Sequence, residues 1–100
     1  MNMIITTIMQ EKQRIEYMRD RYLEELNHLP KGTISEKKSG ERIYYYLKYR
    51  EGGKVISRYI SKDTIEEVRA QVEKRKHVEA MIKSLQEELA IANRALEGTE

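Results

Sequence analysis

The chain has 100 residues, of which 39% are apolar and 36% are charged, and all seven aromatic side chains are tyrosines. This size and composition predict a single domain with a small core, and the absence of cysteine excludes disulfides and thiolate sites. The net charge of +2 is unevenly spread: residues 31–62 carry a net charge of +6, whereas the segments before and after them carry −1 and −3. A positive middle third favours a polyanionic partner.

A helix is predicted from about residue 3 to residue 29. Its apolar side chains recur at steps of three, four or seven residues, which places them on one face of a helix. They are Ile8, Ile15, Met18, Tyr22, Leu26 and Leu29. Pro30 should end the helix, because the residue before a proline avoids helical backbone angles. The β-branched residues near the start leave the first helical residue open.

Three short strands are predicted at about residues 33–38, 42–50 and 54–60. Ser39-Gly40 and Gly52-Gly53 mark the hairpin turns between them, because glycine reaches positive φ without steric cost. If both loops have two residues, the facing pairs include Lys38 with Glu41, Ile34 with Tyr45, Glu51 with Lys54, and Tyr46 with Tyr59. A three-residue loop at the second turn would instead shift the third strand by one residue and mix its faces.

Alternation along these strands separates an apolar face from a basic one. The apolar face, which we expect to pack on the helices, contains Ile34, Glu36, Ile43, Tyr45, Leu47, Tyr49, Ile56, Arg58 and Ile60. The opposite face, which we term the tyrosine face, contains Thr33, Ser35, Lys37, Arg42, Tyr44, Tyr46, Lys48, Arg50, Ser57 and Tyr59, with Val55 near the hairpin tip. An antiparallel sheet can leave such a face in water.

The tyrosine face is the candidate binding surface. Lysine and arginine side chains bind phosphates and release counterions, and tyrosine rings stack on bases or hydrogen-bond to them. The candidate contact residues are Lys37, Arg42, Tyr44, Tyr46, Lys48, Arg50, Lys54 and Tyr59. A purely structural role for the tyrosines stays open, since tyrosine favours strands and cross-strand tyrosine pairs stabilise small sheets.

A second helix is predicted from about residue 63 to residue 96. Asp63 and Glu66 have the spacing of a capping box, which satisfies two free amide groups. Further along, apolar residues follow coiled-coil spacing. They are Val78, Ile82, Leu85, Leu89, Ala92 and Leu96. The basic run EKRKH, at residues 73–77, is interpreted as a solvated face of this helix.

The predicted fold class is α+β. Two long helices, folded as an antiparallel coiled-coil-like hairpin, flank a three-stranded antiparallel β-meander in a single domain of residues 1–100. A narrow apolar stripe needs a partner along its length. That partner is either the other helix or a second copy of the chain, so a homodimer formed through the helical stripes stays open.

Four short motifs follow one another between residues 29 and 63: LPKG, SEKK, YYYLKYREGGK and YISKD. With the charged helix after it, to about residue 89, this pattern resembles an uncharacterised family of small bacterial and archaeal proteins associated with phages and mobile elements. The meander also resembles, more weakly, the arm-type DNA-binding sheets of phage integrases. Those sheets accompany a single helix and a much larger catalytic domain, a pattern from which this sequence departs. The family resemblance implies no activity.

No catalytic motif or phosphate-binding loop is recognisable, so we expect neither an enzyme activity nor a cofactor. His28 and His77 lack a second ligand type at metal spacing. No apolar run approaches the length of a membrane span, and no cleavable leader is recognisable. We therefore expect a cytoplasmic protein with no membrane partner.

Two functions of different class remain. The first is a non-enzymatic protein of phage or mobile-element type that binds nucleic acid or a nucleoprotein complex through the tyrosine face. The second is an anti-defence inhibitor of anti-CRISPR type, or an adaptor, that binds a protein partner such as a nuclease complex, because tyrosine and arginine also anchor protein interfaces. The choice between DNA, RNA and protein stays open at the level of sequence.

Overall fold

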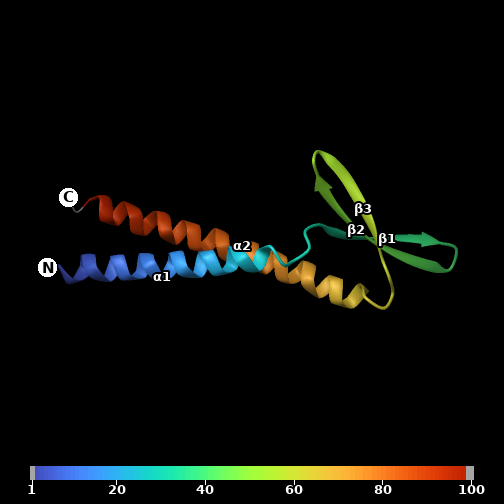
Figure 1. The fold of residues 1–100 in the computed structure, drawn as a ribbon, viewed down its shortest axis with the longest axis horizontal. Helices are drawn as coiled ribbons and strands as arrows, with labels where there is room; N and C mark the ends of the chain where they lie inside the picture. The colour runs from blue at the N-terminus through green and yellow to red at the C-terminus, as the bar shows by residue number, and fades with distance from the viewer. Residues whose placement is uncertain (1, 99–100) are drawn as a thin grey trace. The chain divides into compact units, whose positions relative to one another are not determined.

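The fold is that of a computed structural model, which describes residues 2–98. It contains five elements in the order α1 (Met3–Leu26), β1 (Thr33–Ser39), β2 (Arg42–Glu51), β3 (Lys54–Ile60) and α2 (Ile65–Glu97) (Figure 1). The strands form one antiparallel sheet in the order β1-β2-β3. The predicted fold class, α+β with a β-meander between two helices, is confirmed at this level.

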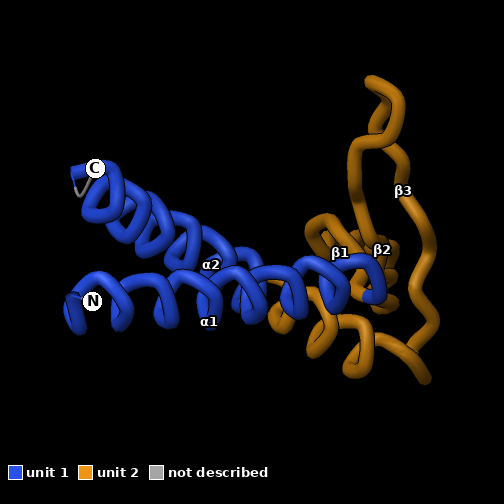
Figure 2. Tube along the Cα trace, turned by 60° about the vertical axis from the view of Figure 1, so that its left-hand side comes forward, with its two compact units in different colours: residues 1–28, 77–100 blue, residues 29–76 orange. Residues whose placement is uncertain are grey.

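The chain divides into two compact units (Figure 2). Unit 1 comprises residues 1–28 and 77–100, so that it contains α1 and the later part of α2. Unit 2 comprises residues 29–76, which contain the sheet and the first part of α2. Neither helix, within the described residues, combines the length and the apolar character needed to cross a membrane.

α1 begins at Met3 although β-branched residues dominate its first turns. Oδ1 of Asn2 caps the helix by accepting a hydrogen bond from the amide of Ile4 at 2.9 Å. The hydroxyl of Thr6 donates to the carbonyl oxygen of Asn2 at 3.2 Å, and that of Thr7 donates to the carbonyl oxygen of Met3 at 2.8 Å. The cap and these back-bonds pair the local polar groups within the helix.

α1 ends at Leu26, three residues before the predicted end at Leu29. The amide of Asn27 donates to the carbonyl oxygen of Glu24 at 3.2 Å. A bond between residues three apart tightens the last helical turn and closes it. Because Pro30 excludes helical angles at the residue before it, the chain leaves the helix ahead of the last apolar position.

β2 and β3 pair in the predicted register, with Tyr46 opposite Tyr59. Gly52 and Gly53 connect them with φ angles of +56° and +78°. Positive φ at both central residues is the requirement of a type I′ hairpin turn, whose twist matches that of the strands.

The register between β1 and β2 differs from the prediction by two residues. Ile34 faces Leu47 instead of Tyr45. The loop consists of Gly40 and Glu41, and only the glycine has a positive φ, +64°. This is the pattern of a type II′ turn, in which glycine stands first. Because the shift is an even number of residues, every side chain keeps its predicted face.

The predicted apolar face of the sheet forms the core of unit 2. Leu47 and Ile60 are buried together with Ile65 and Val72 of α2. The half-buried residues that pack against this cluster are Ile34, Tyr45, Tyr49 and Val68. Three other members of the face, Glu36, Ile43 and Arg58, stay exposed. The first turns of α2 therefore cover one side of the sheet and leave the tyrosine face on the other side.

The start of α2 differs from the predicted cap. Thr64 directly precedes the helix, and its carbonyl oxygen accepts the first helical hydrogen bond from the amide of Val68 at 3.0 Å. Glu66 lies 3.9 Å from Arg69 in an ion pair and does not form the predicted capping box with Asp63. Thr64 therefore takes the N-cap position.

Arg75 of α2 forms a hydrogen bond with the segment between α1 and β1. Its Nη1 donates to the carbonyl oxygen of Leu29 at 2.7 Å, in a partly buried contact. The solvated-face interpretation of residues 73–77 is therefore wrong for Arg75. It holds for Lys76, an exposed residue whose Nζ lies 3.4 Å from the carboxylate of Glu73.

Unit 1 buries one stripe of each helical segment. Ile15 of α1 and Val78, Ile82 and Leu85 of α2 are buried, and Val78 is only 1% exposed. The half-buried members of the predicted stripes are Ile8, Met18, Tyr22, Leu26, Leu89, Ala92 and Leu96. The burial thus follows the periodicity that the sequence predicts for both helices.

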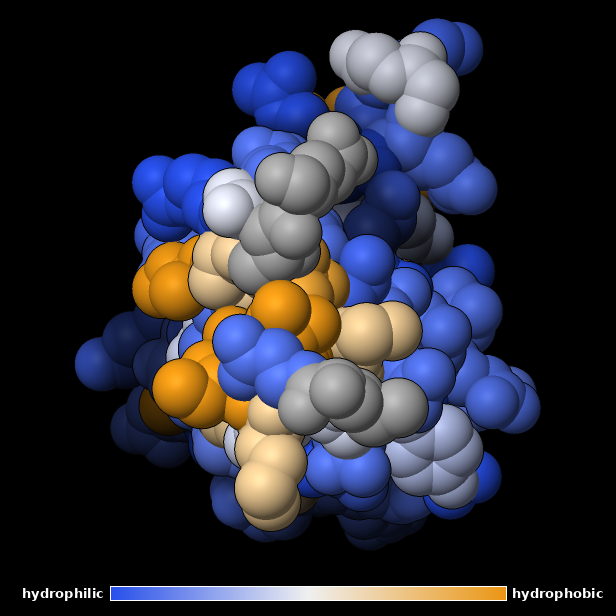
Figure 3. Space-filling view, turned by 90° about the vertical axis from the view of Figure 1, so that its left-hand side faces the viewer, coloured by the Kyte–Doolittle hydropathy of each residue, from blue (hydrophilic) through white to orange (hydrophobic). Residues whose placement is uncertain are grey.

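Other apolar side chains of unit 1 are open to solvent. Figure 3 shows apolar side chains gathered at the end of the unit where the two termini lie. Met3, Ile4 and Ile91 are 82%, 71% and 60% exposed. An exposed apolar group of this kind often marks a protein contact.

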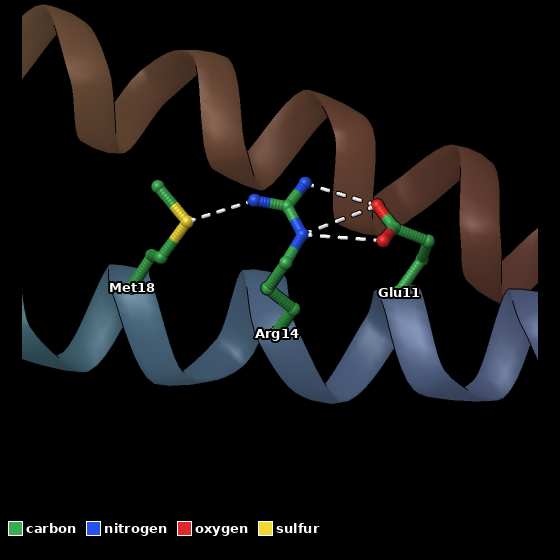
Figure 4. A network of polar contacts seen from close by, with 3 residues as sticks. All are labelled: Glu11, Arg14 and Met18. Atoms are coloured by element: carbon green, nitrogen blue, oxygen red, sulfur yellow. Dashed lines mark hydrogen bonds and ion pairs between the residues drawn. The ribbon is translucent and has the colours of Figure 1, made fainter.

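A short network on α1 holds the side chain of Arg14 (Figure 4). The guanidinium donates to the Glu11 carboxylate, with a shortest distance of 2.9 Å, and Nη1 donates to Sδ of Met18 at 3.1 Å. The hydrogen bond and charge of Arg14 lower the pKa of Glu11. Glu11 raises the pKa of Arg14 in return, and Glu88 of α2 adds to this rise.

Candidate nucleic-acid interface

Seven of the eight predicted contact residues lie on the tyrosine face. They are Lys37 on β1, Arg42, Tyr44, Tyr46, Lys48 and Arg50 on β2, and Tyr59 on β3. Residues directly opposite each other in an antiparallel pair project to the same side, and side chains alternate along each strand. The register pairs Lys37 with Tyr44 and Tyr46 with Tyr59, which joins all three strands on one face.

The tyrosine face also contains Ser39, which the sequence-based list leaves out. Within residues 33–59 the strands place no acidic side chain on it, because two of the three carboxylates of this segment fall on the other side and the third lies in a loop. Glu36 pairs with Tyr45, Glu51 pairs with Lys54, and Glu41 lies in the loop. The observed register therefore keeps the separation of charge that the alternation predicts.

Lys54 is the predicted contact residue that the structure places elsewhere. It pairs with Glu51 at the hairpin tip, and alternation puts this pair on the side of Tyr49 and Leu47. Its ammonium group thus stands across from a carboxylate and not beside the tyrosines. The candidate site accordingly excludes Lys54.

The three tyrosines of the face form one aromatic cluster. The ring centroid of Tyr59 lies 5.9 Å from that of Tyr46, with the planes at 66°, and 6.5 Å from that of Tyr44, with the planes at 52°. Aromatic pairs favour such tilted and edge-to-face contacts. Tyr44 and Tyr46 are half-buried, whereas Tyr59 is 56% exposed. The cluster joins the strands and still leaves one ring exposed to solvent.

The cations of the tyrosine face are uncompensated. Lys37, Arg42, Lys48 and Arg50 are exposed, and none of them has an ion-pair partner within residues 2–98. Ion pairs occur on the helices, for example at Arg14, Arg19 and Lys76. Uncompensated positive charge attracts phosphates, and binding then releases the counterions of the polyanion.

Gly32 allows the chain to pass close to β2, and no role for this residue was predicted from the sequence. Its φ is +127°, and a Cβ at this position would overlap the carbonyl oxygen of Lys48 and lie 3.1 Å from Cβ of Tyr49. Only glycine allows the chain to pass this close to β2. The signal is the glycine of the LPKG motif directly before a strand, a position that marks close backbone approach.

The described residues contain no group of three or more histidine and acidic side chains arranged to hold a metal ion. The tyrosine face instead offers four exposed positive charges and one exposed aromatic ring. Such a surface can bind phosphate groups and stack on a planar ring.

Comparison with known proteins places the chain in a family. Residues 4–70 match the family described as Domain of unknown function (DUF6788), which is more than half of the chain. The chain belongs to this family. The DUF6788 match covers the tyrosine face completely, together with nearly all of α1 and the start of α2. No curated protein and no solved structure matches the chain.

The DUF6788 description carries no activity, so a function for this chain has to be argued from the geometry of the site. The part of the DUF6788 match that lies in unit 2 includes Gly32, both hairpin turns and all seven residues of the candidate site.

Proposed function

We propose that the protein is a non-enzymatic binder of nucleic acid or of a nucleoprotein complex, and that it acts through the tyrosine face. One observation carries the proposal: four exposed cations without ion pairs share an acid-free sheet face with an aromatic cluster. The sequence resemblance adds a proposed setting in phages or mobile elements.

The cations of Lys37, Arg42, Lys48 and Arg50 contact phosphates in this proposal, while Tyr59 contacts a base. Phosphate contacts carry no sequence information, so binding is largely independent of sequence and weakens steeply with salt. Tyr44 and Tyr46 hold the Tyr59 ring in place through the contacts described above.

The helices act as a scaffold for the sheet, and we propose that they pair as an antiparallel hairpin within one chain. Val78, Ile82 and Leu85 are buried in a single chain, without a second copy, and this burial supports the pairing. The influence of Glu88 on the pKa of Arg14 supports it too, since the two side chains come from different helices. In the views of unit 1 in Figures 1 and 2 the two helical segments run alongside each other.

A binding titration tests the proposed function. Fluorescently labelled DNA and RNA, single- and double-stranded, are titrated with the wild type at low salt. The Lys48→Glu/Arg50→Glu variant should lose at least tenfold in affinity, because two phosphate contacts become repulsive. The matched control is Lys38→Glu/Lys54→Glu, which makes the same charge change on the other face. If the wild type binds none of the four probes, the proposed function is wrong.

A second candidate function is that of an inhibitor or adaptor that binds a protein partner, such as a nuclease complex of a bacterial defence system. The exposed apolar side chains at the end of unit 1, Met3, Ile4 and Ile91, favour it. Binding to a purified nuclease complex that survives Lys48→Glu/Arg50→Glu but is lost in Ile4→Asp would support this candidate over the first.

A further inference from the structure

We propose that the ligand of the tyrosine face is a single-stranded nucleic acid that runs along β2. This inference rests on the proposed function and specifies its substrate class. It follows from where the cations stand on the sheet, from what a duplex would require, and from the accessibility of one tyrosine ring.

The charged and aromatic side chains follow one line. Arg42, Tyr44, Tyr46, Lys48 and Arg50 occupy every second position of β2, the central strand. At a rise of about 3.4 Å per residue, this line is roughly 27 Å long. A strand stacked at about 3.4 Å per nucleotide would place about eight nucleotides along it, and an extended strand fewer.

A duplex would require a different distribution of charge. Its two backbones flank a major groove about 12 Å wide, and β1 and β3 lie about 10 Å apart, so a sheet in the groove needs cations on both edge strands. On the tyrosine face β1 supplies Lys37, whereas β3 supplies Val55, Ser57 and Tyr59 and no cation. Three of the four cations form one row on β2, with Lys37 beside it on β1, and such a row suits one backbone.

The aromatic cluster also favours a single strand over a duplex. Tyr59 lies beside the line of β2 and is the most exposed ring of the cluster. The bases of a duplex already stack on their neighbours, whereas an unpaired base has a free face for stacking on a side chain. The ring of Tyr59 can therefore take a base of a strand whose phosphates follow β2.

The test compares labelled oligothymidylates of 4, 8 and 16 nucleotides with a 16-base-pair duplex, by fluorescence anisotropy at low salt. We expect the 16-mer to bind at least tenfold tighter than the duplex. Affinity should rise from 4 to 8 nucleotides and then level off, because the line on β2 is filled. An oligouridylate series checks whether the ribose matters.

Tyr59→Leu isolates the stacking contribution, since leucine keeps an apolar side chain on the sheet. It should weaken single-strand binding about tenfold and leave duplex binding unchanged. Tyr17→Leu is the matched control, because Tyr17 is an exposed tyrosine of α1 outside the face. Tyr59→Phe should retain binding, which distinguishes loss of the ring from loss of the hydroxyl. Circular dichroism confirms that each variant is folded.

The outcomes separate this inference from the proposed function. If the duplex binds as tightly as the single strand and Lys48→Glu/Arg50→Glu abolishes that binding, the inference is overturned while the proposed function stands. If no nucleic acid binds, both fail. Unchanged single-strand affinity in folded Tyr59→Leu would also overturn the inference.

Discussion

Tyr46 and Tyr59 stand directly opposite each other on β2 and β3, with ring centroids 5.9 Å apart and planes inclined at 66°. The pair joins the two strands on the face that is not covered by α2. A structural role and a binding role for these tyrosines are therefore compatible, because the contact uses the edge of one ring and Tyr59 remains 56% exposed. Each role has its own measurable consequence.

The structural role predicts that Tyr59→Ala lowers the free energy of unfolding by about 1 to 2 kcal/mol, since two aromatic contacts are lost. Urea denaturation followed by circular dichroism measures this change. Tyr17→Ala, at an exposed helical position with one contact to Arg21, should cost about 0.5 kcal/mol or less. Equal effects of the two variants would show that the cluster contributes nothing to the sheet.

The close approach at Gly32 predicts that Gly32→Ala destabilises the protein by about 2 to 3 kcal/mol, because the new Cβ meets the backbone of β2 at an unfavourable φ. Gly52→Ala is the comparison: its φ is also positive, at +56°, but no atom lies within 4 Å of the added Cβ. It should cost only about 1 kcal/mol. Thermal unfolding ranks the two, and the reverse order would contradict the account of the LPKG motif.

The contact of Arg75 with Leu29 predicts that Arg75→Met lowers the free energy of unfolding by about 1.5 to 2.5 kcal/mol, because a charged donor to a partly buried carbonyl is removed. Lys76→Met removes only an exposed ion pair with Glu73 and should cost less than about 0.5 kcal/mol. Chemical denaturation of both variants makes the comparison. Similar small effects would mean that Arg75 is no more than a solvated residue.

The proposed helical hairpin predicts that Leu85→Ala costs about 2 to 4 kcal/mol, since it opens a cavity at a buried position. Ile91→Ala, at an exposed position of the same helix, should cost less than about 0.5 kcal/mol. Light scattering of the wild type should give the mass of a monomer. A dimer that dissociates in Leu85→Ala would instead assign the stripe to a contact between two chains.

The register of β2 and β3 was predicted correctly because Gly52 and Gly53 can both take positive φ, which favours the two-residue loop over the three-residue alternative. The pairing of β1 with β2 was harder to predict. Ser39-Gly40 marks a turn, but the residue pair alone does not tell whether glycine takes the first or the second central position. The structure puts Gly40 first, which moves the pairing by two residues and leaves the faces unchanged.

The helical periodicity of the apolar residues predicted which side chains are buried, among them Ile15 and Leu85. An apolar stripe on a helix is stable only when it packs against other apolar side chains. The helix ends were less predictable. The choice of Thr64 over Asp63 as the N-cap depends on where the chain leaves β3, and the early end of α1 depends on how the chain passes into Pro30. The helix period describes neither connection.

Seven of the eight candidate contact residues follow from strand alternation alone. Lys54 does not, because its pairing with Glu51, which the sequence also predicts, puts it on the other side. The contacts of Gly32 and Arg75 join segments distant in sequence. A glycine directly before a strand indicates a close approach but not its partner, and Arg75 has no comparable local signal.

The salt dependence of binding is the most direct test of the central claim, that the cations of the tyrosine face contact phosphates. Four phosphate contacts to a single strand predict a slope of about −3 in a plot of log K against log salt, which is a loss of about 50-fold between 50 and 200 mM. Lys48→Gln/Arg50→Gln should halve this slope, and Lys38→Gln/Lys54→Gln on the other face should leave it unchanged. A slope near zero, or the same slope in both variants, would contradict the account.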